Sequence, residues 1–272
     1  MVERHQRGLS ADHIDVPDTE VSPVARRRSQ RVPTLVINLD SQPERFERFR
    51  ISNGFLGDIE RFPALAGALL DRARLTAVDL VDPTLECTPG ALGCALSHLL
   101  LWQRAVDKGV PITVLEDDVI VNRGFEAQVT RVLCELPADW DIIYWGWNFD
   151  APLMLDLLAG VSCGLLQGDQ NSLRRQLPRF QALDIRPHAV RMLSACGTLA
   201  YTVSARGASK FIGGCVPLKP IPGVRDPHTH GPFYGVDLAM GTLFPSMNAY
   251  VCVPPLVVSP NDDSSTSERA HG

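Results

Sequence analysis

The sequence predicts an α/β fold, in which β-strands alternate with α-helices around one sheet. Short runs of β-branched and apolar residues recur along the chain, and several are followed by a turn and a helical pattern. The first run, residues 34–39, leads through a polar turn into a helix that starts at Pro43, because proline is favoured at the first helical position. A strand, loop and helix in this order are typical of nucleotide-binding α/β domains.

The later segments continue this alternation. Thr88 and Pro89 predict the start of a long helix that ends near Gly109, since threonine is a good N-cap and glycine a good C-terminal residue. Residues 150–190 show no regular pattern, and a connection of that length is usually functional or mobile. Buried strands are predicted at 112–115 and 140–146, further strands at 59–64 and 197–203, and helices at 125–136 and after Ser204.

Composition places the chain among globular enzymes. Its 272 residues are 45% hydrophobic and 21% charged, and the net charge of −5 gives no general attraction to nucleic acid. Seven dispersed cysteines without a C-x-x-C pair predict reduced thiols, not a disulfide framework. Because neither a signal-type apolar region nor a membrane-length apolar run is present, we expect a cytoplasmic protein.

The expected organisation is one domain with two polar ends. Residues 1–31 lack any period and predict a disordered tail, the domain covers 32–258, and 259–272 form a flexible end. The tail carries an arginine cluster at Arg26, Arg27, Arg28 and Arg31. Two interpretations stand: peripheral contact with an anionic membrane at its inner face, or a solvated linker, which is the usual behaviour of a charge run.

Three consecutive acids, Glu116, Asp117 and Asp118, follow the predicted strand at 112–115. Ionised carboxylates cannot lie unpaired in a core, so they are expected at the carboxyl end of the strand, where α/β sheets bind ligands. In extended chain Glu116 and Asp118 point to one side and Asp117 to the other. A divalent cation such as Mn²⁺ or Mg²⁺ would relieve their repulsion; the alternative is a solvated acidic turn.

An ordered set of short motifs resembles glycosyltransferase family 25, which includes lipopolysaccharide and lipooligosaccharide sugar transferases and collagen galactosyltransferases. Each motif alone is weak, but the combination is specific and spans most of residues 34–258. The motifs are Val36-Ile37-Asn38-Leu39, Pro43-Glu44-Arg45, Ala66-Gly67, Gly93-Cys94-Ala95-Leu96-Ser97-His98 with Trp102, Leu115-Glu116-Asp117-Asp118-Val119, Asp139-Trp140-Asp141, Gly197-Thr198 with Tyr201, and Val236-Asp237.

The resemblance implies a GT-A-type fold, a single nucleotide-sugar-binding domain with a mixed, mostly parallel sheet flanked by helices. It also implies inverting, metal-dependent transfer of a hexose, with galactose favoured, from a UDP-sugar donor to a saccharide or glycolipid acceptor. The expected setting is the biosynthesis of lipopolysaccharide or another surface glycan. One position departs from the family pattern, which usually has a glutamate just before the Gly-Cys pair where this chain has Ala91.

Site residues are assigned on this basis. Asp237 is the expected base for the acceptor hydroxyl, because metal-bound acids are poorly basic; capping the following helix is the alternative. For His98 and Arg45 the alternatives are a core histidine and an exposed helix arginine. Metal binding is assigned to Glu116, Asp118 and His230, donor binding to Asn38, Leu39, Arg45, Ala66, Gly67, Ser97 and Asp117, and catalysis to Asp237 and His98.

Two other classes of function remain open. A nucleotidyl or phosphoryl transferase would use the same acids and metal without a sugar acceptor. A catalytically silent homologue that binds a nucleotide sugar or a glycan is the other class, and Ala91 favours it.

Overall fold

The computed structural model describes residues 31–224 and 233–261. The chain divides into two units, Met1–Arg31 and Val32–Gly272, and the elements below belong to the second. The predicted tail with its arginine cluster lies almost wholly outside the described residues.

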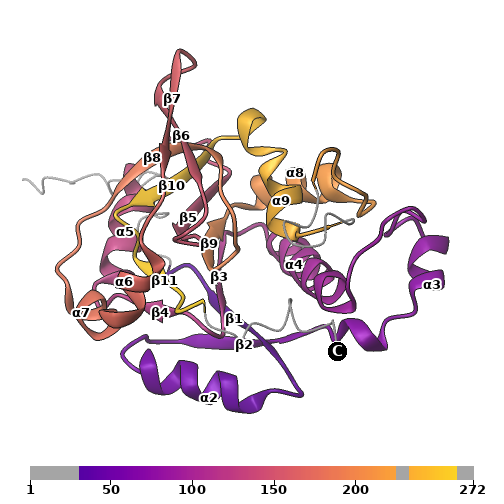
Figure 1. The fold of residues 1–272 in the computed structure, drawn as a ribbon, viewed down its shortest axis with the longest axis horizontal. Helices are drawn as coiled ribbons and strands as arrows, with labels where there is room; N and C mark the ends of the chain where they lie inside the picture. The colour runs from indigo at the N-terminus through magenta and orange to yellow at the C-terminus, as the bar shows by residue number, and fades with distance from the viewer. Residues whose placement is uncertain (1–30, 225–232, 262–272) are drawn as a thin grey trace, which may run out of the picture. The chain divides into compact units, whose positions relative to one another are not determined.

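A nine-stranded mixed sheet forms the centre of the described residues (Figure 1). β1 (Thr34–Leu39) pairs in parallel with β2 (Ile59–Ala64) on one side and β3 (Ile112–Glu116) on the other. β9 (Ala200–Val203) lies antiparallel between β3 and β5 (Ile142–Gly146). This arrangement brings the start of β9 to the same edge of the sheet as the end of β3.

The second half of the sheet extends from β5 to a projecting hairpin. β10 (Ala249–Val253) is parallel to β5, and β8 (His188–Ser194), β6 (Leu153–Leu158) and β7 (Ser162–Leu166) follow in antiparallel pairs. In the main sheet as described, β9, β8 and β7 therefore run opposite to the other strands. The predicted α/β fold with a mixed, mostly parallel sheet is confirmed.

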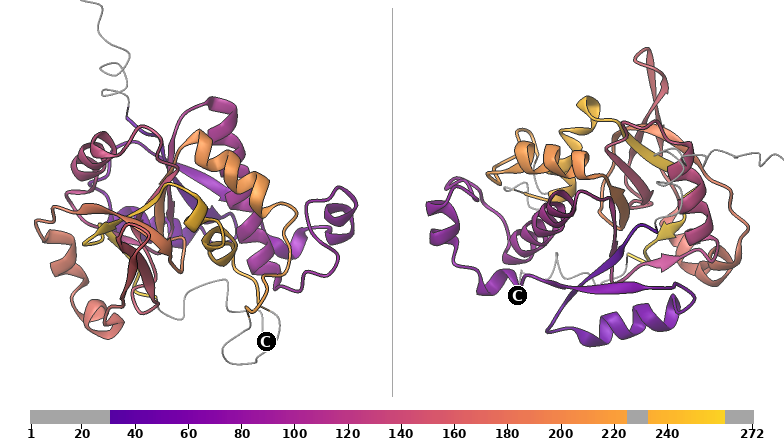
Figure 2. Two further views of the ribbon diagram at one scale, coloured as in Figure 1. Left: turned by 90° about the horizontal axis from the view of Figure 1, so that it is seen from above. Right: turned by 180° about the vertical axis from the view of Figure 1, so that it is seen from behind.

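Helices cover both faces of this sheet, because successive strand residues point to opposite sides. In β5, Ile142 and Tyr144 face one apolar cluster and Ile143 and Trp145 face the other. The first cluster contains residues of α4 (Pro89–Lys108), α8 (Ala205–Cys215) and α9 (Val236–Gly241); the second contains residues of α2 (Pro43–Ser52) and α5 (Phe125–Glu135). Figure 2 shows α4 and α8 lying side by side.

Smaller elements complete the described chain. β4 (Ile120–Val121) pairs with β11 (Val257–Val258) in a separate two-stranded sheet. Within the described ranges, no helix combines the length and apolarity needed to cross a membrane. The remaining short segments are α3 (Arg72–Ala77), α6 (Gln170–Arg175), α7 (Leu177–Ala182), η1 (Gly67–Leu69) and η2 (Phe244–Ser246).

The predicted ends of the long helix are confirmed. Thr88 is the N-cap of α4, with its hydroxyl accepting a hydrogen bond from Ala91 N, and Pro89 is the first helical residue. Gly109 ends the helix with a φ of 64°, a left-handed conformation that glycine adopts without a Cβ clash.

The prediction that residues 150–190 lack regular structure is wrong. They form the β6–β7 hairpin, the two short helices α6 and α7, and the start of β8. The two helices were missed because each has only six residues, which is too short for an amphipathic period to repeat. The hairpin turns at Gly160, whose φ is 75°.

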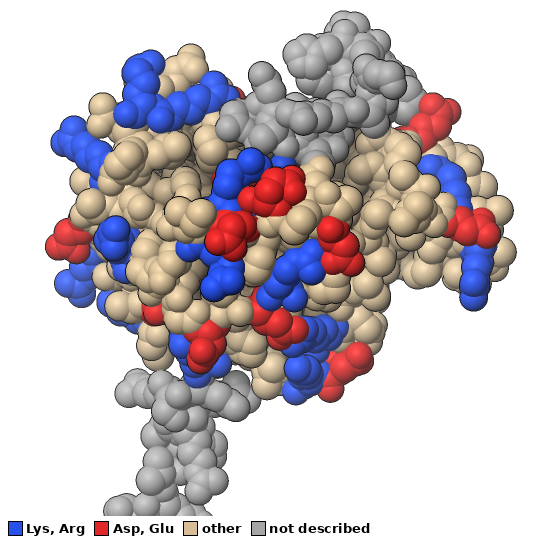
Figure 3. All heavy atoms as spheres, turned by 90° about the horizontal axis from the view of Figure 1, so that it is seen from below, with Lys and Arg blue, Asp and Glu red and all other residues tan. Residues whose placement is uncertain are grey.

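Charges of both signs are interspersed on the face of the molecule seen from below (Figure 3). On the protein surface, Arg61 pairs with Asp40 and Arg104 with Glu60. That face therefore presents no extended positive surface for a polyanion.

Asp141 ties α8 to the start of β10. Its fully buried carboxylate accepts hydrogen bonds from Lys210 Nζ at 2.6 Å, Arg206 Nε at 2.8 Å and Asn248 N at 2.8 Å. Burial acts to raise the pKa of Asp141, but these donors outweigh it and hold the pKa below its ordinary value.

We expect Asp141→Asn to lower the free energy of unfolding by about 1–3 kcal/mol at pH 7, since three donors lose an anionic acceptor. Because the folded-state pKa is depressed, this stabilisation exists above the ordinary aspartate pKa of about 3.9 and is lost as pH falls. Urea unfolding at pH 7 and pH 3 measures both effects. Equal stability of wild type and variant at pH 7 would contradict the prediction, and Asp107→Asn on exposed helix surface is the control.

Candidate active site

The acidic residues lie at the carboxyl end of β3, as expected from the sequence. β3 ends at Glu116, and Asp117 and Asp118 form a turn before β4. Polar residues at the end of β1 and at the start of β9 meet them there, because β1 and β9 are the two neighbours of β3. A site is therefore built from three strands that are distant in the sequence.

Asp117 is held by donors from β1 and α2. Its carboxylate accepts from Asn38 Nδ2 at 2.6 Å and from Arg45 Nε and Nη2 at 2.8 and 2.5 Å. Arg45 is buried, and its Nη2 also lies 3.4 Å from Asp118 Oδ2. The exposed-helix alternative for Arg45 is therefore wrong. Arg61 Nε donates to Asn38 Oδ1 and extends the network to β2.

Glu116 is enclosed by other carboxylates. Burial raises its pKa to about 8, and the charges of Asp118, Asp117 and Asp237 act in the same direction. Only the Thr198 hydroxyl, which donates to Glu116 Oε1, opposes the rise. A carboxylate in this environment is stabilised either by binding a proton or by a cation beside it.

Asp237 approaches the same place from α9. Its Oδ2 accepts from Gly197 N at 2.7 Å. Burial raises the pKa of Asp237, although hydrogen bonds from backbone N–H groups oppose the shift. Gly235, and not Asp237, is the N-cap residue of α9. The Asp237 carboxylate nevertheless accepts from the backbone N–H groups of Leu238 and Asp237 in the first turn, so part of the capping alternative holds.

The dipeptide Gly197-Thr198 connects the two acids. The backbone N–H of Gly197 binds Asp237, and the hydroxyl of Thr198 binds Glu116. Gly197 has a φ of 84°, and a Cβ there would lie 2.4 Å from Asn148 Oδ1, so only glycine fits. Thr198 and Asn148 were not among the predicted site residues, because their proximity depends on strand pairing between β9 and its neighbours.

Ser97 fastens the loop after β2 to α4. Its hydroxyl donates to Gly93 O at 2.7 Å and accepts from Leu65 N at 2.9 Å. The packing is close, because a Cβ on Gly67 would lie 1.6 Å from Pro89 O and one on Gly93 would lie 2.4 Å from Leu65 O. The predicted donor residues Ala66 and Gly67 thus lie in a loop fixed to the helix.

His98 lies in the core on α4. Its Nδ1 is 2.8 Å from the hydroxyl of Tyr201, which also accepts from Trp102 Nε1 at 3.1 Å. Burial lowers the pKa of His98 to about 4, so the ring is neutral at pH 7. Among the described residues its buried Nε2 makes no hydrogen bond, so the core-histidine alternative holds for one ring nitrogen only. The catalytic assignment of His98 stays a prediction.

The remaining assigned residues have different outcomes. Leu39 is the last residue of β1 and is partly exposed beside Asp40. His230 lies outside the described residues, together with Asp226 and His228. Within the described ranges, no group of three or more His, Cys, Asp or Glu side chains is arranged to hold a metal ion. The assignment of Glu116 and Asp118 as metal ligands stays a prediction.

A family model for "Glycosyltransferase family 25 (LPS biosynthesis protein)" matches residues 32–222. The chain belongs to glycosyltransferase family 25. The matched region contains β1, β3, β9 and the Gly197-Thr198 dipeptide, so the family resemblance noted in the sequence is confirmed.

Individual relatives match parts of the chain. A "Glycosyltransferase 25 family member" of Aedes aegypti is 35% identical over 41% of this chain and 20% of its own length. A "Probable inactive glycosyltransferase 25 family member 3" of Bos taurus is 29% identical over 65% of this chain and 28% of its own length. "Procollagen galactosyltransferase 1" of Danio rerio is 29% identical over 46% of this chain and 17% of its own length. The match thus spans less than a third of each of these relatives.

We expect Gly197→Ala to destabilise the protein more than Gly160→Ala. Both glycines have positive φ, but a Cβ at Gly160 meets nothing within 4 Å, whereas at Gly197 it meets Asn148. Gly160→Ala should cost about 1–2 kcal/mol for the left-handed conformation alone, and Gly197→Ala should cost more. Thermal unfolding of both variants measures the difference; equal losses would show that Asn148 moves away freely.

Proposed function

We propose that the protein is an inverting glycosyltransferase that moves a hexose, with galactose favoured, from a UDP-sugar to a saccharide or glycolipid acceptor in surface-glycan biosynthesis. The observation that carries the proposal is the grouping of Glu116, Asp118 and Asp237 around Gly197-Thr198 in a family 25 chain. The family description supports a role in lipopolysaccharide biosynthesis. The galactosyltransferase name of the zebrafish relative supports galactose.

Mn²⁺ or Mg²⁺ fits the carboxylates at the end of β3. Burial and the charge of Asp118 raise the proton affinity of Glu116, and carboxylate oxygens suit hard divalent cations. When bound there, the cation supplies Lewis-acid stabilisation of the departing diphosphate. Asp117 has a different part in this proposal: its bonds to Asn38 and Arg45 fix the turn that carries the two ligands.

Donor binding is proposed at the ends of β1 and β2. Asn38 and Leu39 end β1, and Ala66 and Gly67 follow β2. In α/β sheets the carboxyl ends of parallel strands form the nucleotide site. Ser97 contributes by fixing the second loop through Leu65 N, and Arg45 supplies positive charge beside Asp118.

Asp237 is the proposed base. It takes the proton from the acceptor hydroxyl while that oxygen attacks the sugar carbon on the face opposite the diphosphate. Burial favours this role, because it raises the proton affinity of the carboxylate. The Gly197 N–H holds one carboxylate oxygen, Oδ2, in place, and the backbone N–H groups of Leu238 and Asp237 also donate to this carboxylate.

A catalytically silent relative is the second candidate. The bovine relative's name includes "probable inactive", and the family glutamate is replaced by Ala91. Ala91 is three residues after the N-cap Thr88, where a glutamate would complete a capping box at the start of α4. Replacing the glutamate by alanine therefore removes a capping contact at the start of α4 and not a group that acts on the substrate. This favours the active candidate.

The deciding experiment incubates the protein with UDP-galactose, with and without Mn²⁺, and identifies the products. Metal-dependent release of UDP supports the transferase. Release of pyrophosphate or UMP would instead support a nucleotidyl or phosphoryl transferase. Neither product, together with a donor-induced rise in melting temperature, would support the silent homologue.

We expect Asp118→Asn to abolish Mn²⁺-dependent UDP release while the melting temperature stays near that of wild type. A neutral amide is a much poorer ligand for a hard cation than a carboxylate. Asp107→Asn, on exposed helix surface, is the matched control and should retain full turnover. Activity of Asp118→Asn equal to wild type would refute the metal assignment.

We expect Asp237→Asn to reduce transfer about 10²–10⁴-fold, the usual contribution of a general base. Asparagine keeps the shape and can still accept from Gly197 N, so donor affinity and melting temperature should change little. Titration with UDP-galactose measures the donor affinity, and thermal unfolding measures the melting temperature. A collapse of donor affinity would make Asp237 a ligand of the donor or metal, and near-normal transfer would remove it from the mechanism.

A further inference from the structure

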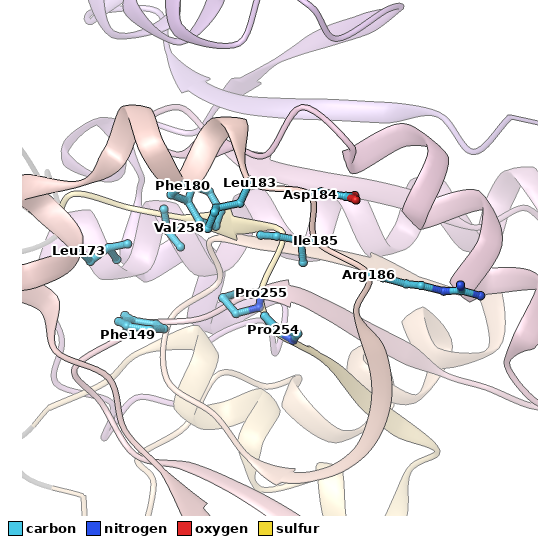
Figure 4. A pocket seen from close by; sticks show the side chains of 10 residues that line it. All are labelled: Phe149, Leu173, Phe180, Leu183, Asp184, Ile185, Arg186, Pro254, Pro255 and Val258. Atoms are coloured by element: carbon cyan, nitrogen blue, oxygen red, sulfur yellow. The ribbon is translucent and has the colours of Figure 1, made fainter.

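An apolar groove of about 400 Å³ lies between the short helices α6 and α7 and the chain that follows β10 (Figure 4). Phe180, Ile185 and Val258 form buried parts of its wall. Leu183 is 46% exposed and marks its open side. A large exposed aliphatic side chain at the mouth of an apolar groove indicates that a ligand has access.

Two segments that line the groove lead to segments of the candidate active site. Phe149, which lines it, directly follows Asn148, the residue packed against Gly197. Val258, on another wall, pairs with Ile120 of β4, two residues after Asp118. A molecule in the groove is therefore bound next to segments that carry the site, although the groove contains none of the assigned residues.

The segment that forms one wall of the groove is rich in basic residues, and one of them, Arg186, lines the groove. The segment 173–186 contains Arg174, Arg175, Arg179 and Arg186 against the single acid Asp184, a net charge of 4 − 1 = +3, in a chain with net charge −5. Arg186 and Asp184 both line the groove, and Arg186 extends away from its apolar centre (Figure 4). Arg174 donates hydrogen bonds to Pro260 O and Asn261 O, and Arg175 donates to Ser172 Oγ. Within the described ranges, Arg179 and Arg186 form no ion pair with an acidic side chain.

We propose that this groove binds the hydrocarbon chain of an anionic amphiphile, with the anionic head group at the arginines. The apolar wall takes the chain because burial of each methylene is favourable. The guanidinium groups of Arg186, which lines the groove, and of Arg179 attract a phosphate or carboxylate. A free phosphate would leave the apolar wall exposed, and a neutral lipid would leave the arginines unused. The combination of both features selects the amphiphile.

The probe is a series of butyl, hexyl and octyl phosphates, titrated into the full chain by isothermal titration calorimetry. We expect affinity to rise up to about fourfold for each added methylene that the groove buries. Inorganic phosphate should not bind detectably at the same concentrations, and octyl glucoside, which has a chain but no charge, should bind about tenfold more weakly than octyl phosphate.

Variants locate the site. Leu183→Asp puts a charge at the mouth and should weaken octyl phosphate binding about tenfold or more, and Arg186→Glu should weaken octyl phosphate but not octyl glucoside. The matched controls are Leu69→Asp and Arg50→Glu, on exposed surface elsewhere. Melting temperatures confirm that all four variants fold.

Unchanged octyl phosphate binding in folded Leu183→Asp would overturn the proposal, as would affinity independent of chain length. Binding of an acidic, leucine-rich peptide in the absence of any alkyl phosphate binding would overturn it in favour of a protein partner. These titrations contain neither donor nor metal, so their outcome is separate from that of the UDP-release experiment.

Discussion

The buried pairing of Arg45 with Asp117 is the interaction on which the site depends. It joins α2 to the turn after β3, and Asn38 from β1 completes it. Burying the two charges costs solvation, and the two hydrogen bonds from Arg45 together with that from Asn38 offset this cost. Loss of one partner from such a pair usually costs about 3–5 kcal/mol, because the other charge is left buried. The pair fixes the turn, so Glu116 and Asp118 are presented together in spite of their repulsion.

A second constraint comes from β9, which lies between β3 and β5 and runs against both. An antiparallel strand at this position brings its first residues to the carboxyl end of its neighbours. Gly197 and Thr198 thereby reach Asp237 and Glu116 at once. A purely parallel sheet would place the end of a strand there and not its beginning.

Local chemistry made much of the fold predictable. Thr88, Pro89 and Gly109 determine the ends of α4 through their own backbone and side-chain preferences. The acids after β3 were predictable from the cost of burying charge. The pairing of Arg45 with Asp117 was not, because the two residues are 72 positions apart and an arginine at a helix start is ordinarily solvated. The β6–β7 hairpin was missed because some of its leucines face solvent and others face the core. The sequence therefore lacks the alternation of apolar and polar residues that indicates a half-buried strand.

The glycine contact between the loop after β2 and α4 has a mechanical consequence. Backbone atoms of Gly67 and Gly93 approach so closely that no side chain fits between the loop and the helix, and Ser97 joins the two by hydrogen bonds. The loop therefore cannot open as an independent flap. If the site changes shape for ligands of different size, the movement must occur in segments that are not bonded to α4 in this way.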